Sequence, residues 1–128
     1  MTEMEWKKDI NENVRSGIVE LLILQLLSEK EMYGYEIRKA LAQRTNNAFE
    51  MKEASLYGPL YRMSSRGLIS SRKEVVNGKR FRVYYRIEDF GRQYLAYGIE
   101  QIRYVFSGVM NLLDGKDETC EKENINES

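Results

Sequence analysis

The fold of this chain is constrained most by the two short segments on either side of Asn77-Gly78. In residues 79–87, KRFRVYYRI, apolar or aromatic side chains alternate with mostly basic ones. Such period-two alternation is typical of a strand with one packed face and one solvated face. Asn-Gly between two such runs favours a two-residue turn with positive φ at both positions. We therefore predict a β-hairpin with strands at 69–76 and 79–87, one face packed on the domain and the other basic and wet.

A helix is predicted just before the hairpin, over residues 52–66. Its buried face, at positions i, i+4 and i+7, is formed by Leu56, Leu60 and Met63. Gly67 stands where a left-handed residue commonly ends a helix. Pro59 conflicts with this helix, because an interior proline removes one hydrogen bond and clashes with the preceding turn. We expect an irregular first turn, or a regular helix that begins near Gly58.

Two further helices are predicted upstream. Apolar residues at helical spacing predict one helix from Trp6 to Leu27, through Ile10, Val14, Ile18, Leu21 and Leu22. Its second half is apolar on most sides, which is typical of a central, buried helix. A second helix opens at Tyr33 and continues to about Arg44, where Thr45-Asn46-Asn47 favours a turn. The stretch between the two helices is predicted to be a polar break.

The last helix follows Asp89, a plausible N-cap, and carries an apolar seam in steps of four and three residues. The seam residues are Leu95, Ile99, Ile102, Phe106, Val109 and Leu113. Such a seam indicates helix-on-helix packing, either with a second copy or with the chain's own core, and we favour a homodimer. We expect a globular domain at 1–88, a dimerisation helix at 89–114 and a disordered acidic tail at 115–128.

Composition argues against an enzyme. There is no histidine, the usual general base and a common metal ligand, and Cys120 is the only cysteine. The sequence holds no Gly-rich phosphate loop and no nucleophile elbow. We therefore predict no cofactor and no metal. The longest aliphatic run is too short to span a bilayer and the first residues lack an apolar signal segment, so we expect a cytoplasmic location and no membrane contact.

Charge is sorted along the chain even though its sum is zero, with 20 basic and 20 acidic residues. Residues 62–86 hold eight bases and one acid, a local charge of +7. Residues 114–128 hold six acids and two bases, a local charge of −4. A sorted distribution creates a local field although the total cancels. The hairpin region therefore presents a positive surface.

Three helices followed by a hairpin form the plan of a winged helix-turn-helix, an α+β fold that is mainly α. In that fold the third helix enters the major groove of double-stranded DNA and the hairpin, or wing, lies along the backbone or minor groove. The bases of the wing would then contact phosphates. The alternative is that they only protect an exposed strand from aggregation. With the helices before the hairpin and the seam after it, we favour DNA binding.

Several motifs occur in order over residues 15–95. They are Leu21 to Leu27, Tyr33-Gly34-Tyr35-Glu36-Ile37, Ser55-Leu56-Tyr57 with Leu60, Arg62 and Met63, Arg66-Gly67-Leu68-Ile69, and Tyr84-Tyr85-Arg86-Ile87 with Gly91-Arg92. In this order and spacing they resemble the PadR family of bacterial transcriptional regulators. The single last helix is similar to that of the subfamily with a short C-terminus, which includes multidrug-responsive repressors.

The resemblance implies a homodimeric repressor that binds a palindromic operator and is released by a small molecule or a stress signal. This sequence departs from the family pattern at Tyr57-Gly58-Pro59, where the proline is displaced by one position. It also has Lys52 in place of the usual helix-capping hydroxyl and Glu88 in place of a threonine before the last helix. The competing hypothesis is a protein-interaction adaptor that uses the same fold without DNA.

Residue roles follow from this scheme as hypotheses. The expected DNA contacts are Lys52, Ser55, Tyr57 and Tyr61 on the third helix, Lys73, Lys79 and Arg80 on the wing, and Tyr33 at the start of the second helix. Tyr33 has an alternative role in packing against Leu41. An aromatic or drug-like effector would bind at a dimer interface lined by Trp6, Ile10, Val14, Tyr97, Tyr104 and Phe106. The alternative is simple packing, which is the more common role of aromatic side chains at helical spacing.

Overall fold

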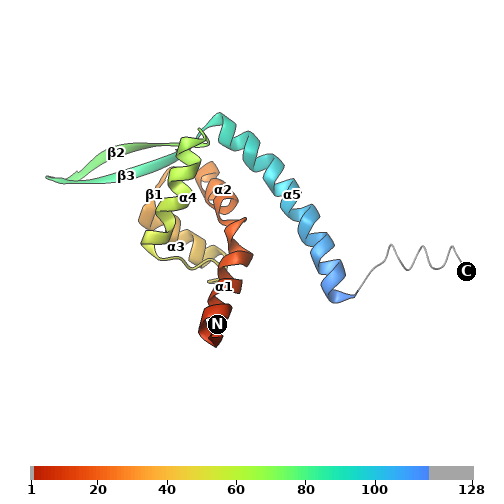
Figure 1. Ribbon diagram of the computed structural model, residues 1–128. Coiled ribbons are helices and arrows are strands. Elements are labelled where there is room, and N and C mark those ends of the chain that lie inside the picture. Colours follow the sequence, from red (N-terminus) through yellow and green to blue (C-terminus); the bar gives the residue numbers. More distant parts are fainter. Residues whose placement is uncertain (1, 116–128) are drawn as a thin grey trace, which may run out of the picture. The chain divides into compact units, whose positions relative to one another are not determined.

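The computed structural model describes residues 2–115 (Figure 1). In chain order its elements are α1 (Glu3–Ser16), α2 (Val19–Glu29), β1 (Met32–Tyr33), α3 (Gly34–Arg44), α4 (Glu53–Ser65), β2 (Ile69–Asn77), β3 (Arg80–Ile87) and α5 (Asp89–Asp114). The predicted α+β class, mainly α, is confirmed. The chain divides into two compact units between Ala96 and Tyr97. The predicted acidic tail, with Cys120, lies outside the described residues apart from Gly115.

The core of the first unit is formed where α2 contacts α3, α4 and β3. Its fully buried side chains are Ile23 and Leu24 of α2, Ile37 and Leu41 of α3, Leu56, Leu60 and Met63 of α4, and Leu68. The predicted central helix and the predicted buried face of the third helix are both confirmed by this packing. Burial of each such aliphatic side chain stabilises the fold by about 1.5–3 kcal/mol.

The predicted helix from Trp6 to Leu27 is wrong in one respect, because it is two helices. The first, α1, ends at Ser16 and is capped by Gly17, and α2 begins at Val19. Glycine has a low helix propensity because it loses the most backbone freedom on ordering, so the helix stops there. α1 begins with a capping box, in which the Thr2 hydroxyl accepts a hydrogen bond from the Glu5 N–H. No residue of α1 is buried.

α4 is regular from Glu53 onward, so the expectations of an irregular first turn and of a start near Gly58 are wrong. A proline ring normally clashes with the Cβ of the residue before it, and here that residue is a glycine. The Pro59 ring is itself buried in the core, which offsets the lost hydrogen bond. Packing therefore outweighs the local cost of the proline.

The end of α4 matches the prediction. Gly67 has a φ of +77°, the Leu68 N–H donates to the Met63 carbonyl (2.9 Å) and the Gly67 N–H donates to the Ser64 carbonyl (3.1 Å). These two bonds form a Schellman motif, which satisfies carbonyls that the helix would otherwise leave free. The carbonyl of Leu68 then accepts the N–H of Glu88 at 2.9 Å, next to the start of α5. Leu68 thus joins the end of α4 to the start of α5.

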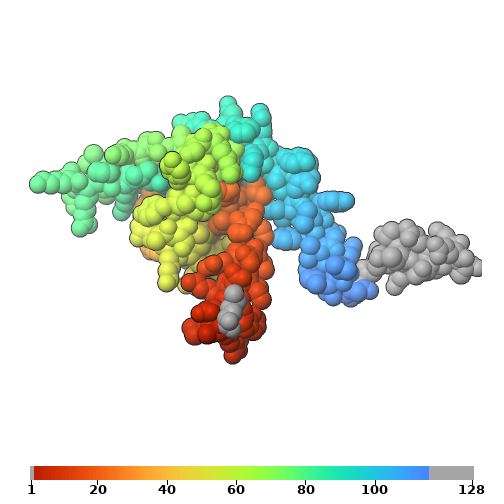
Figure 2. All heavy atoms as spheres, in the orientation of Figure 1, coloured from red at the N-terminus to blue at the C-terminus, as the bar shows by residue number. Residues whose placement is uncertain are grey.

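The hairpin belongs to a three-stranded antiparallel sheet of order β1-β3-β2. β1 was not predicted, and it adds Met32 opposite Tyr85 and Tyr33 opposite Tyr84. Asn77 pairs with Arg80, and the register shifts between Val75 and Asn77. The hairpin extends beyond the helices, and in the space-filling view it is a narrow finger (Figures 1 and 2).

The turn of the hairpin differs from the prediction, because it is formed by Gly78-Lys79 rather than by Asn77-Gly78. Gly78 has a φ of +59°, whereas Asn77 is not among the residues with positive φ. The bulge in β2 adds one residue to that strand and so moves the turn one position along the chain.

α5 begins at Asp89, so the N-cap position is occupied by Glu88. The N-cap therefore lies one residue before the predicted one, Asp89. Of the seam residues, Leu95 is buried in the first unit and Ile99 and Ile102 are half-buried. In the second unit Phe106, Val109 and Leu113 are exposed. Within residues 2–115 no helix has both the length and the hydropathy needed to cross a bilayer.

Candidate nucleic-acid interface

The exposed face of α4 carries the side chains predicted to contact DNA. Lys52 precedes the first turn in an extended conformation, and Ser55 follows in that turn. Tyr57 and Tyr61 lie one turn apart and point away from the core, with 56 % and 73 % of their surfaces exposed. Because the opposite face of α4 is buried, this helix is held rigidly with its polar side outward.

Two neighbours act on the hydroxyl of Tyr57. It donates a hydrogen bond to Oε1 of Glu53 at 3.1 Å. This bond, and to a smaller extent burial and the nearby Tyr85, raises the pKa of Tyr57 above its ordinary value. The phenol therefore stays neutral and remains a hydrogen-bond donor at physiological pH. Tyr85 shares its face of β3 with Ile87, which is buried in the core that α4 helps to form.

The two faces of the hairpin differ in chemistry. Side chains on paired strands share a face when their residues are directly opposite, and the face alternates along each strand. One face therefore holds Phe81, Tyr85 and Ile87 of β3 with Val75 and Lys73 of β2. The other holds Arg80, Arg82, Tyr84 and Arg86 with Arg72 and Glu74. The first face packs on the domain only near its base, where Ile69 and Ile87 are buried.

Half of the bases in residues 62–86 are paired with carboxylates. Glu20 of α2 lies 3.0 Å from Nε of Arg62 and 3.6 Å from Nη1 of Arg66. Arg72 is held between Glu31 (2.9 Å) and Glu74 (2.8 Å). Hydrogen bonds to these two carboxylates raise the pKa of Arg72 above its ordinary value. The last pair joins Arg86 to Glu88 at 3.5 Å.

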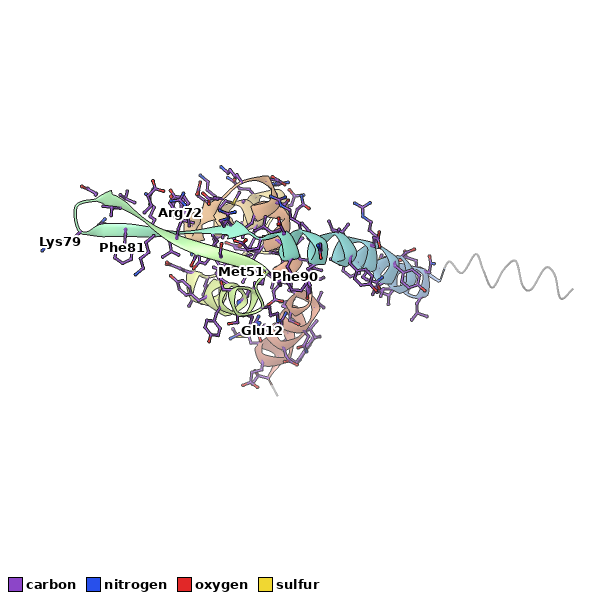
Figure 3. All side chains as sticks on the ribbon, turned by 90° about the horizontal axis from the view of Figure 1, so that it is seen from above. Glu12, Met51, Arg72, Lys79, Phe81 and Phe90 are labelled. Carbon is purple, nitrogen blue, oxygen red and sulfur yellow. The ribbon has the colours of Figure 1, made fainter. Side chains whose placement is uncertain are left out.

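Four bases of the hairpin form no ion pair with any residue between 2 and 115: Lys73, Lys79, Arg80 and Arg82. Lys79 lies in the turn at the tip of the hairpin (Figure 3). Sequence reasoning selected the first three of these bases and missed Arg82. Arg82 could have been selected from its place in the alternation of residues 79–87, where it stands among the basic side chains. The local charge of +7 thus overstates the charge available to a partner, because the pairs neutralise part of it.

Tyr33 is half-buried in an aromatic cluster at the edge of the sheet. Its ring lies edge-on to Tyr84 (5.5 Å between centroids) and is stacked on Tyr35 (6.2 Å). The guanidinium carbon of Arg82 lies 4.4 Å from the centroid of the Tyr33 ring, a cation–π contact. The side chain of Tyr33 thus contacts these aromatic rings and Arg82, and its N–H donates a hydrogen bond to Oε1 of Glu36 at 3.2 Å.

Two more bases that sequence reasoning missed lie near the start of α4. Arg38 and Lys39 of α3 line a shallow hollow of about 320 Å³ together with Tyr35, Ala42, Glu50 and Met51. Nothing in their spacing marked them for a role beyond their charge, since single bases on a helix are ordinary surface residues. Their position next to α4 extends the positive surface to α3.

The residues proposed for an effector site divide between the two units. Trp6, Ile10 and Val14 are exposed on α1 of the first unit. Tyr97, Tyr104 and Phe106 are exposed on the part of α5 in the second unit. Neither of the two hollows described on the surface is lined by any of these six side chains.

The arrangement of α2, α3 and α4 followed by the β2–β3 hairpin defines a winged helix-turn-helix protein. Residues 23–97 match the model of the transcriptional regulator PadR-like family. The chain belongs to this family of transcription regulators, so it is a DNA-binding regulator and not an enzyme. The resemblance seen in the motifs is thereby confirmed.

Similar proteins agree with this assignment. An uncharacterized protein of Lysinibacillus sphaericus is 37 % identical over 87 residues, which cover 68 % of this chain and 80 % of that protein. A transcriptional regulator of Clostridium thermocellum has a TM-score of 0.68 and 32 % identity, over 76 % of this chain and 91 % of that one. A PadR family regulator of Clostridium difficile R20291 has a TM-score of 0.63 and 31 % identity, over 74 % and 96 %.

The fold is also similar to that of Bacillus subtilis PadR in complex with operator DNA. The TM-score is 0.60 and the identity 24 %, over 64 % of this chain and 46 % of that one.

Proposed function

We propose that this protein is a homodimeric repressor that binds a palindromic operator and is released by a small molecule or a stress signal. The observation that supports operator binding best is the pairing pattern of the charges. Carboxylates neutralise the bases near the core, whereas Lys73, Lys79, Arg80 and Arg82 stay available on the hairpin. Together with the exposed tyrosines of α4, they give a helix for the groove and a wing for the phosphates.

The proposed dimer rests on α5. Phe106, Val109 and Leu113 repeat at seam spacing and are exposed in the single chain. Apolar side chains in such a row are stabilised when a second helix covers them. In this scheme residues 1–88 bind DNA and residues 89–114 join the two copies. A two-fold dimer presents two copies of α4, which matches the symmetry of a palindrome.

The release signal is assigned to the aromatic side chains of α1 and α5. An exposed tryptophan with nearby apolar residues on the same helix, Ile10 and Val14, suits a planar, apolar or cationic ligand. The protein acts in the cytoplasm, where bacterial DNA is located. The family supports this location, because its members are transcription regulators.

Salt dependence of binding tests the DNA contacts. Arg82 is held over the Tyr33 ring. Lys73, Lys79 and Arg80 of each of two wings therefore neutralise six phosphates, and the wings contribute about −5 to the slope of log affinity against log salt concentration. Lys79→Ala with Arg80→Ala removes four of these charges from the dimer, and the wing contribution falls to about −2. Gel retardation of the DNA upstream of the protein's own gene, at several salt concentrations, measures the slope. Lys7→Ala with Lys8→Ala, which removes equal charge from α1, is the matched control.

The outcomes separate the two hypotheses. A flatter slope for the wing variant but not for the control supports the assignment. An equal slope for wild type and wing variant would sink the wing contacts. If the wild-type protein fails to retard this DNA even at low salt, the adaptor hypothesis gains and the repressor is rejected.

Val109→Asp tests the dimer. It places a charge on the exposed seam, where burial against a partner would cost several kcal/mol. The variant is expected to have the mass of one chain, 15.1 kDa, in light scattering, whereas wild type has the mass of two. Gln101→Asp, at an exposed position of α5 outside the seam, is expected to stay dimeric. A dimeric Val109→Asp variant would place the interface elsewhere.

A further inference from the structure

An apolar pair lies exposed near the tip of the hairpin. Phe81 and Val75 are directly opposite each other on β3 and β2, with 55 % and 72 % of their surfaces exposed. Nζ of Lys73 lies 4.8 Å from the centroid of the Phe81 ring. The charge protects this edge of the sheet against aggregation, but it does not explain the ring. A phenyl group held in water by a projecting hairpin indicates a surface that contacts a partner.

The position of the pair indicates which partner. Phe81 shares its face of the hairpin with Ile87 and with Ile69 opposite it, and both are buried at the base of the hairpin, where β2 contacts α4. In Figure 3 Phe81 and Arg72 project from opposite sides of the hairpin ribbon. The ring is therefore on the α4 side of the wing, and Arg72 with its two carboxylates is on the other side. A duplex that contacts α4 would meet this face.

The surroundings of the ring are positive. Lys73 stands beside it, Lys79 lies in the turn and Arg80 begins β3. The one acid of the hairpin, Glu74, belongs to the opposite face and is paired with Arg72. An apolar wedge among cations complements a minor groove, where phosphates line both walls and bases can be unstacked. An apolar protein partner would not need the cations.

We propose that Phe81, backed by Val75, is a wedge that the wing inserts into the minor groove beside the site of α4, where it bends the DNA. This inference rests on the proposed DNA binding and adds to it. Lys73 holds the ring and neutralises a phosphate at the groove edge. Phe81 thereby selects for DNA steps that unstack easily, a readout of deformability rather than of base edges.

The test compares Phe81→Ala with Phe81→Leu, which keeps an apolar side chain. Phe90→Ala is the matched control, because that ring is similarly exposed (52 %) but lies at the start of α5. We measure affinity by gel retardation of the upstream DNA. Bending is measured from the change in gel mobility of the complex as the bound site is moved from the end to the middle of a DNA fragment. Phe81→Ala is expected to weaken binding about tenfold, and Phe81→Leu by at most about threefold. The salt slope is unchanged in both variants, because no charge is lost.

Reduced bending by Phe81→Ala, at an unchanged salt slope, supports the wedge. Wild-type affinity and bending for Phe81→Ala, or equal losses for Phe90→Ala, would overturn it. If Phe81→Ala instead lowers the mass of the protein in light scattering, the ring joins two copies and the wedge is rejected. Failure of DNA binding as such is a separate result, because it is seen already with the wild-type protein. Circular dichroism checks that each variant is folded.

Discussion

Gly91 occupies the tightest backbone contact described in this protein, and its replacement by alanine is predicted to destabilise the first unit. A Cβ at this position would lie 2.1 Å from the carbonyl oxygen of Leu68 and 2.8 Å from Cγ1 of Ile87. The carbonyl cannot move freely, because it accepts the hydrogen bond of the Glu88 N–H. The first turn of α5 must therefore shift away from the end of α4.

Two effects oppose each other in this variant. Overpacking in a well-packed region costs about 1–3 kcal/mol, and a contact against fixed backbone belongs at the upper end. Alanine is favoured over glycine inside a helix by about 1 kcal/mol. The net loss in the free energy of unfolding is therefore about 2 kcal/mol. For a unit of this size, such a loss lowers the melting temperature by roughly 10 °C.

Thermal and urea unfolding followed by circular dichroism measure this loss. Gly17→Ala is the control, because a Cβ there meets nothing within 4 Å and the φ of −83° suits any residue. It is expected to be neutral or to stabilise by about 0.5 kcal/mol. Equal stability of Gly91→Ala and wild type would refute the reasoning, since it would mean that the α4–α5 contact yields at no cost.

Two more predictions concern charge and ligand. Glu31→Gln with Glu74→Gln frees Arg72, but this side chain lies on the face of the wing away from α4, so the salt slope of DNA binding is expected to stay within about one unit of wild type. Glu12→Gln on α1 is the control, and a slope steeper by about 2 would show that this face of the wing also contacts phosphates. If the effector site includes Trp6, planar aromatic cations quench its fluorescence and release the DNA. No response to a varied panel of such compounds would leave the tryptophan a purely structural role.

The hairpin and the core were predictable because both depend on short, regular patterns. Alternation in residues 79–87 fixed the strand, and Leu56, Leu60 and Met63 fixed the buried face of α4. Gly67 marked the end of α4 correctly, because glycine adopts the positive φ of a helix end without the steric penalty that a Cβ brings. These features are local in sequence, so the sequence alone carries them.

Other features depended on contacts distant in sequence. The i, i+4 spacing of Val14 and Ile18 concealed the helix break at Gly17. The prediction at Pro59 counted only its usual local cost, but Gly58 removes the clash with the preceding Cβ and burial of the ring offsets the rest. β1 has only two residues, Met32 and Tyr33, which are too few to show the alternation typical of a strand. The pairing of Arg62 with Glu20 joins residues far apart in the sequence, so a sum of charges along the chain overestimated the free positive charge.

Leu68 connects α4, the helix that we propose reads DNA, directly to the first turn of α5, the proposed dimerisation helix. Its N–H closes the cap of α4, while its carbonyl holds the chain just before α5 and lies against Gly91. A shift of the first turn of α5 therefore acts on the end of α4 through the peptide unit of Leu68. In the proposed dimer, a ligand that displaced the first turn of α5 would thereby also displace the end of α4, the helix that we propose enters the groove.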